Sequence, residues 1–88
     1  MYAHDALGWA LFRSGDCQAA LPEARAANRM ESADPLLAYH LGAIAACAGK
    51  RTEAVTALRR AQGSNPRFHP LYGPDTVRLL AKLGEPVA

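Results

Sequence analysis

The stretch from Tyr39 to Pro66, YHLGAIAACAGKRTEAVTALRRAQGSNP, decides the fold. Apolar residues recur in it at helical spacing, first ahead of Gly49 and again ahead of Gly63. Glycine readily adopts the left-handed backbone conformation that ends a helix, so Gly49 separates two short helices. The stretch therefore predicts an antiparallel pair of helices joined by a tight turn.

The ends of this helix pair carry their own signals. Asp34 is a favourable N-cap, and Pro35 is a favourable first helical residue because its missing N–H has no helical partner there in any case. Gly63 and Asn65-Pro66 stop the second helix. The positions expected to be buried are Leu37, Leu41, Ile44, Ala45 and Ala48 in the first helix, and Ala54, Val55, Leu58 and Ala61 in the second.

The same plan occurs earlier in the chain, after a shift of 41 − 7 = 34 positions. The coinciding features are Leu7-Gly8 with Leu41-Gly42, Gly15 with Gly49, and Ala20-Leu21 with Ala54-Val55. A fixed period in this range is typical of stacked helical units. The first pair is expected to bury Ala3, Leu7, Ala10 and Leu11 of one helix and Ala20, Leu21, Ala24, Ala27 and Met30 of the other, with a mild kink at Pro22.

Small residues stand where the two helices of each pair should cross. Gly8 and Gly42 occupy equivalent places in the first helices, and Ala20 and Ala54 do so in the second helices. Removing side-chain bulk lets two helix backbones approach closely, and a larger residue would overpack the contact. The many alanines are therefore interpreted as contact positions.

These features resemble the tetratricopeptide repeat, whose pattern is W-x2-L-G-x2-Y, then A-x3-F, then P. The matches are Leu41, Gly42, Ala54 and Pro66 in the second copy, with Leu58 in place of the aromatic residue, and Leu7, Gly8 and Ala20 in the first. The departures are His4 and Ala38 for the tryptophan, and Leu11 and Ala45 for the tyrosine. The resemblance implies an all-α, right-handed superhelical stack with repeats at residues 1–34 and 35–68.

The remaining residues, 69–88, are expected to form a capping helix. Pro74 and Asp75 open it, an apolar stripe follows at Val77, Leu80 and Leu83, and Gly84 with Pro86 closes it. Such a helix would cover the open face of the second pair. The tail is similar to the C-terminal end of bacterial arrays of this repeat, which suggests that further repeats precede it in a longer parent chain.

Several function classes find no support in the sequence. It contains no G-x-S-x-G, H-E-x-x-H, P-loop or dinucleotide-binding motif, so no enzyme activity, cofactor or metal is expected. The two cysteines, Cys17 and Cys47, lack C-x-x-C spacing. They are interpreted as small buried hydrophobic residues, and no disulfide between them is expected. The absence of a signal peptide in the given sequence favours the cytoplasm, although an upstream signal in a longer parent chain stays open.

Charge and hydropathy bear on the partners. The net charge of +2 is too small to indicate nucleic-acid binding, and acidic residues are interleaved with Lys50-Arg51 and Arg59-Arg60, as on a solvated face. The sequence contains no run of about 18 apolar residues, so no membrane partner is expected. A protein or peptide partner is the remaining expectation.

In the family it resembles, the first helices of successive repeats line a concave groove. The corresponding positions are Tyr2, Asp5, Trp9, Phe12, Arg13, Leu36, Tyr39, Ala43, Ala46 and Cys47. Spacing of 2, 5, 9 and 12 places four of them on one helix face. Three occupants of this face stay open: packing of Trp9 on Tyr39 and Ala43, a ligand segment, or a second copy of the chain.

The expected function is a protein–protein interaction module that binds an extended or helical segment in this groove. The lysine and asparagine clamp by which some family members hold carboxylates is absent, because Asp5 and Trp9 occupy two of its places. Alternatives are a structural end-piece of a longer scaffold, or a regulatory segment of an enzyme or DNA-binding protein. A two-fold homodimer is a further expectation.

Overall fold

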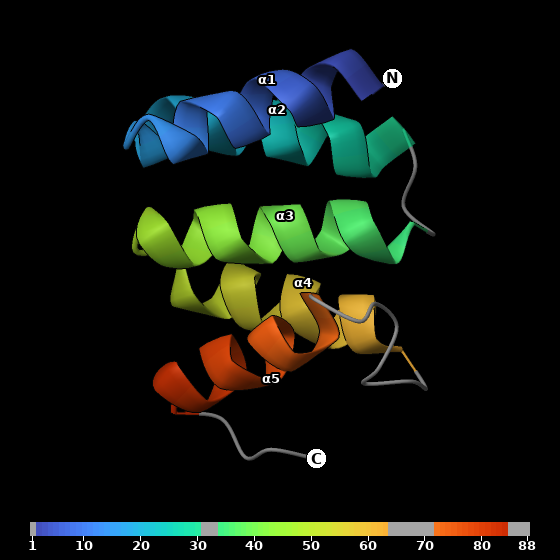
Figure 1. Ribbon diagram of the computed structural model, residues 1–88, viewed down its shortest axis with the longest axis vertical. Coiled ribbons are helices and arrows are strands. Elements are labelled where there is room, and N and C mark those ends of the chain that lie inside the picture. Colours follow the sequence, from blue (N-terminus) through green and yellow to red (C-terminus); the bar gives the residue numbers. More distant parts are fainter. Residues whose placement is uncertain (1, 31–33, 64–71, 85–88) are drawn as a thin grey trace.

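Five α-helices make up the part of the chain that the computed structural model describes, which is residues 2–30, 34–63 and 72–84. They are α1 (Tyr2–Arg13), α2 (Cys17–Met30), α3 (Pro35–Cys47), α4 (Arg51–Gln62) and α5 (Tyr72–Lys82). In Figure 1, α1 and α2 lie at the top, α3 crosses the middle, and α4 and α5 lie below. Successive helices pack together, most extensively α1 on α2 and α3 on α4. The expected all-α class with paired neighbours is confirmed.

The local signals of the second pair act as predicted. The Asp34 carboxylate accepts a hydrogen bond from the Leu36 N–H at 2.9 Å, and Pro35 is the first residue of α3. Gly15 and Gly49 both have positive φ, of 92° and 82°, in the turns after α1 and α3. These backbone conformations are open to glycine at little cost, which is why each helix ends where it does. The prediction for Asn65-Pro66 lies outside the described residues.

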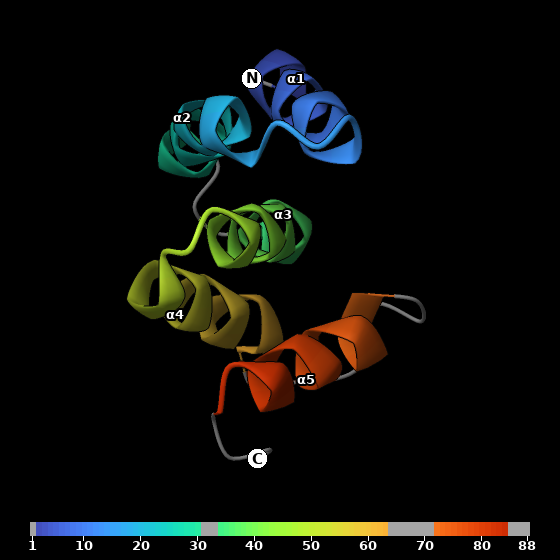
Figure 2. The same cartoon turned by 90° about the vertical axis from the view of Figure 1, so that its left-hand side faces the viewer.

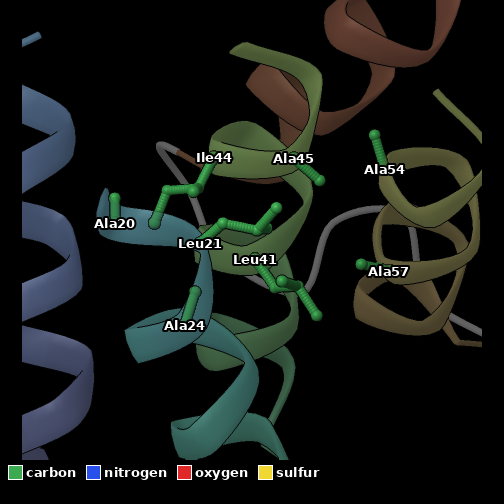
Figure 3. Close-up of a cluster of buried hydrophobic side chains, with 8 residues drawn as sticks. All are labelled: Ala20, Leu21, Ala24, Leu41, Ile44, Ala45, Ala54 and Ala57. Atoms are coloured by element: carbon green, nitrogen blue, oxygen red, sulfur yellow. The ribbon is translucent and has the colours of Figure 1, made fainter. Parts of the chain in front are cut away.

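Helix α3 is the centre of the molecule. It contacts all four other helices, and every residue from Leu37 to Ala45 is buried. Figure 3 shows the core cluster that joins α2, α3 and α4, formed by Ala20, Leu21, Ala24, Leu41, Ile44, Ala45, Ala54 and Ala57. Five of these eight are alanines, so the helices must approach closely for the remaining leucines and the isoleucine to fill the space.

The two glycines expected at helix crossings lie at close contacts. A Cβ at Gly8 would stand 3.3 Å from the Ala24 backbone nitrogen on α2. A Cβ at Gly42 would stand only 2.5 Å from Cδ2 of Leu58 on α4. A side chain at either place would therefore press on the facing helix, and most severely at Gly42.

The first pair differs from the expectation on its outer side. Leu7, predicted to be buried, is 50% exposed, and Met30 is exposed as well. Ala10 is also exposed, whereas Gly8 is buried. The reason is that α2 covers the Gly8 side of α1, and none of the described helices covers the side that carries Leu7. Helix α2 itself continues through Pro22 to Met30 without a break.

Helix α5 packs on α3 and α4, beside α4 in the view of Figure 2. It begins at Tyr72, two residues earlier than the predicted start at Pro74. Its buried residues are Gly73, Thr76 and Leu80, so Leu80 alone of the predicted stripe is fully buried, while Val77 and Leu83 are half-buried. Thr76 is tolerated in the core because its hydroxyl donates to the Tyr72 carbonyl at 2.7 Å.

The cysteine prediction was wrong, because Cys17 and Cys47 form a disulfide. Cys17 is the first residue of α2 and Cys47 the last of α3, and their Cα atoms lie 5.9 Å apart. The two glycine turns leave these helix ends side by side, and the Gln18 side chain also donates to the Ala48 carbonyl there, at 3.3 Å. Sequence spacing alone did not reveal this neighbourhood.

The disulfide also bears on the compartment. Such bonds persist in oxidising environments and are rare where glutathione keeps thiols reduced. The linkage therefore favours an oxidising compartment over the cytoplasm expected from the sequence. Within the described ranges, no helix is long and apolar enough to cross a membrane.

Candidate functional site

A groove with a volume of about 540 Å³ runs between α1, α3 and α5. Six of the residues predicted from the sequence line it: Trp9, Phe12, Tyr39, Ala43, Ala46 and Cys47. Helix α5 supplies the opposite wall with Asp75, Leu79 and Lys82, and Leu83 follows directly after the helix. The structure thus brings together side chains from three helices around one hollow.

Stacked rings form one wall of the groove. The Trp9 ring stacks on Phe12 with centroids 4.8 Å apart and on His40 with centroids 4.1 Å apart. Tyr39 stacks in turn on Tyr72 of α5, at 4.7 Å. Ring pairs at these separations attract each other beyond the effect of area burial alone. The wall is therefore held in place by its own contacts, whether or not the groove is occupied.

Asp5 supports this wall from behind. Its carboxylate lies 2.6 Å from Nδ1 of His40, and both side chains are largely buried. This pair orients the imidazole on which Trp9 stacks, so Asp5 acts within the molecule and does not line the groove. Arg13 is exposed and does not line the groove either. Tyr2 lies in α1, but its side chain is outside the described part of the structure.

A partly buried hydrogen bond joins the opposite wall to α3. The Tyr39 hydroxyl donates to the Asp75 carboxylate at 2.5 Å, and Arg78 donates to the same carboxylate. Partial burial acts to raise the pKa of Asp75, but the bonds from Tyr39 and Arg78 together hold that pKa below its ordinary value. Asp75 is thus a charged acceptor that ties α5 to the floor of the groove.

The same contact predicts a late tyrosine titration. Burial, followed by the bond to Asp75, raises the pKa of Tyr39 well above its ordinary value. The folded chain therefore keeps this proton to higher pH than the unfolded chain, so the associated stability is present below about pH 10 and is lost as pH rises further. Phenolate absorbance should show a late step coincident with unfolding. Tyr39→Phe should abolish that step and Tyr72→Phe should retain it; its persistence in Tyr39→Phe would contradict the assignment.

The α5 wall was not predicted from the sequence. Its residues lie far along the sequence from the other groove residues, and the bond between Tyr39 and Asp75 spans 36 positions, which is beyond the reach of local patterns. One available signal was the pairing of Leu79 with Leu83, one helical turn apart and displaced from Leu80. That pair indicates a second apolar side of α5, which is the side that faces the groove.

Two basic side chains outside the groove, Arg25 and Arg60, bind other parts of the protein. Arg25 forms two hydrogen bonds with Glu53, at 2.8 and 2.6 Å, and Arg60 donates to the buried Asn28 at 2.8 Å. Asn28 donates in turn to the carbonyls of Ala24 and Leu37. Within the described residues, no three His, Cys, Asp or Glu side chains gather in a way that suits a metal ion.

The chain matches no protein-family model, no curated protein and no solved structure.

Proposed function

We propose that the protein is an interaction module that binds a peptide segment of a partner protein in the groove between α1, α3 and α5. The observation that carries this proposal is the composition of the groove, with an aromatic wall, a floor of small residues and an opposite wall in which two leucines lie beside Asp75 and Lys82. Binding sites are typically concave and mostly apolar with a few polar groups. Buried aromatic residues are also the usual energetic anchors of protein recognition.

The groove favours a particular kind of segment. The large side chains of Trp9 and Phe12 lie beside the small side chains of Ala43 and Ala46. This difference in size leaves room for one bulky apolar side chain of a ligand. Lys82 is exposed at the α5 side of the groove and offers a cation. We therefore propose a peptide in which a bulky apolar residue lies next to an acidic one, whose carboxylate pairs with Lys82.

We also propose that the pairs α1–α2 and α3–α4 are repeats of the tetratricopeptide type and that α5 is their cap. The support is the equivalence of the crossings. Gly8 faces Ala24, and Gly42 faces Leu58, which is position 24 + 34 = 58. The same shift relates the glycines of the two turns, Gly15 and Gly49.

A second candidate is a structural end-piece of a longer scaffold, and the exposure of α1 favours it. Leu7 is 50% exposed, whereas its equivalent Leu41 is 6% exposed. Leu41 lies in a cluster with residues of α4 and also of α2, which belongs to the preceding pair, whereas no preceding pair lies beside Leu7 among the described helices. By the same geometry, the Leu7 side of α1 suits another helix pair, supplied by a preceding repeat or by a second copy of the chain.

A displayed library of random peptides tests the proposed function. The library is selected on the oxidised protein, and the recovered peptides are compared on two variants. Ala46→Trp fills the groove, whereas Ala81→Trp adds the same bulk to an exposed position of α5 outside it. We expect recovered peptides rich in bulky apolar and acidic residues, bound at least about tenfold more weakly by Ala46→Trp and unchanged by Ala81→Trp.

Trp9→Ala provides the internal check, with helical content and unfolding midpoint measured on the same sample. Loss of affinity by about tenfold with a retained fold supports the groove. A lower midpoint with unchanged affinity would assign Trp9 to packing alone. Failure of the library to distinguish Ala46→Trp from the parent protein would remove the proposed function.

A further inference from the structure

The two cysteines of the disulfide differ in their exposure to solvent. Cys47 is exposed and lines the groove at the end of α3. Cys17 is 8% exposed, at the first residue of α2. A reagent that enters the groove therefore meets the Cys47 side of the bond first.

We propose that this disulfide is a thiol–disulfide exchange site whose substrate is a cysteine-containing peptide held in the groove, an inference that rests on the proposed function. The thiolate of the peptide attacks Sγ of Cys47. A new sulfur–sulfur bond forms between the peptide and Cys47, the bond between Cys47 and Cys17 breaks, and its electron pair leaves on the Cys17 thiolate. One disulfide replaces another, so no external oxidant or reductant is consumed.

The position of Cys17 suits a leaving group. Thiolates are stabilised at helix N-termini, where free N–H groups and the helix dipole present positive potential. The Asp16 carboxylate already accepts from the Ala19 N–H at 3.1 Å and partly offsets this effect. The direction of attack is therefore determined mainly by access, because exchange depends on which sulfur an incoming thiolate reaches.

A second contact between α2 and α3 does not involve the disulfide. Asn28 donates to the Leu37 carbonyl at 2.8 Å and joins α2 to α3 at the end opposite the disulfide. The core cluster lies between this contact and the disulfide. When the disulfide opens, one end of the contact is released, and this hydrogen bond and the core cluster remain to join α2 and α3. The peptide becomes covalently attached beside Ala46, at the floor of the groove.

Two single-cysteine variants test the predicted asymmetry. Cys17→Ser leaves only the Cys47 thiol, and Cys47→Ser leaves only Cys17. Each is treated with dithiodipyridine, and the released thiopyridone is followed by absorbance, with helical content as the control for folding. We expect Cys47 to react at least about tenfold faster than Cys17. Equal rates, or faster reaction of Cys17, in folded variants would overturn the proposal.

The oxidised parent chain provides the second measurement, in which neither cysteine is replaced. It is incubated with the cysteine peptide glutathione, quenched with an alkylating agent and mapped by mass. We expect glutathione on Cys47 and the alkyl group on Cys17, with formation slowed about fivefold or more by Ala46→Trp and unchanged by Ala81→Trp. Glutathione on Cys17, or no adduct without denaturant, would overturn the proposal.

The two proposals fail separately. Glutathione attached to Cys47 together with a library that yields no groove-dependent peptide leaves the exchange site and removes the proposed function. Groove-dependent peptides together with a disulfide that resists glutathione leave the function and remove the exchange site.

Discussion

Gly42→Leu should destabilise the protein by about 3 kcal/mol, at the upper end of the usual cost of overpacking. A Cβ at this position already lies 2.5 Å from Cδ2 and 2.6 Å from Cγ of Leu58. Leu58 is fully buried against Tyr39, Ala61 and Leu80, so its side chain has no free volume into which to turn. Helix α4 must therefore move away from α3, and the core that the two helices share is lost with it.

Alanine substitutions make the comparison sharper, because they add a single methyl group. Gly8→Ala meets its neighbours at 3.3 to 3.4 Å, and the gain of about 1 kcal/mol in helix propensity should nearly offset the crowding. Gly42→Ala has the same gain but a far closer contact, and it should still destabilise by about 1 kcal/mol. Urea unfolding midpoints measure both changes. Equal midpoints for the two alanine variants, or an unchanged midpoint for Gly42→Leu, would contradict the crossing geometry.

Reducing the Cys17–Cys47 disulfide should lower the free energy of unfolding by about 3.5 kcal/mol. The bond joins residues 30 positions apart, and closing a loop of that length restricts the unfolded chain by roughly this amount. For a domain of this size the change corresponds to a melting temperature about 20 °C lower. The loss is a large part of the roughly 5–15 kcal/mol by which domains are stable, so the reduced protein should be marginal.

Thermal unfolding with and without a reductant measures this effect. Gln18→Ala is the matched control, since it removes the other contact between the same helix ends, at 3.3 Å, and should cost less than about 1 kcal/mol. The doubly substituted Cys17→Ser/Cys47→Ser chain should have the same melting temperature as the reduced protein. Equal melting temperatures for the oxidised and reduced forms would show that the bond does not restrict the unfolded chain as expected.

Local signals in the sequence were enough to predict helix pairs. The start of α3 is determined by Asp34 and Pro35, and its end by the glycine that follows at position 49. Each of these effects operates within one or two helical turns, so neighbours in the sequence suffice to predict it. The small residues at positions 8 and 42 likewise indicated where helices must approach, and the structure places both at such contacts.

The predicted groove residues were only partly brought together. Spacing and the family resemblance selected the six that line the hollow, Trp9 and Tyr39 among them, and helical periodicity is the reason they share a side. The same reasoning assigned Asp5 to the groove surface, although it bonds to His40 behind the wall. Helical periodicity predicts the side of its own helix on which a residue lies. It does not predict which residue of a neighbouring helix will lie opposite it.

The tertiary structure alone decided the remaining features. The contacts between Cys17 and Cys47, between Asp5 and His40, and between Tyr39 and Asp75 join residues 30 to 36 positions apart. Each depends on how helices of different pairs, or α5 and α3, lie on one another, which changes with small shifts of the angle at which the helices cross. The exposed Leu7 has the same origin, because its own pattern is that of a buried residue and only the lack of a covering helix among those described leaves it in water. The sequence therefore determined the helices and the faces on which they can pack. The tertiary structure decided which of these faces is covered by another helix, because a side chain is buried only where a second surface lies against it.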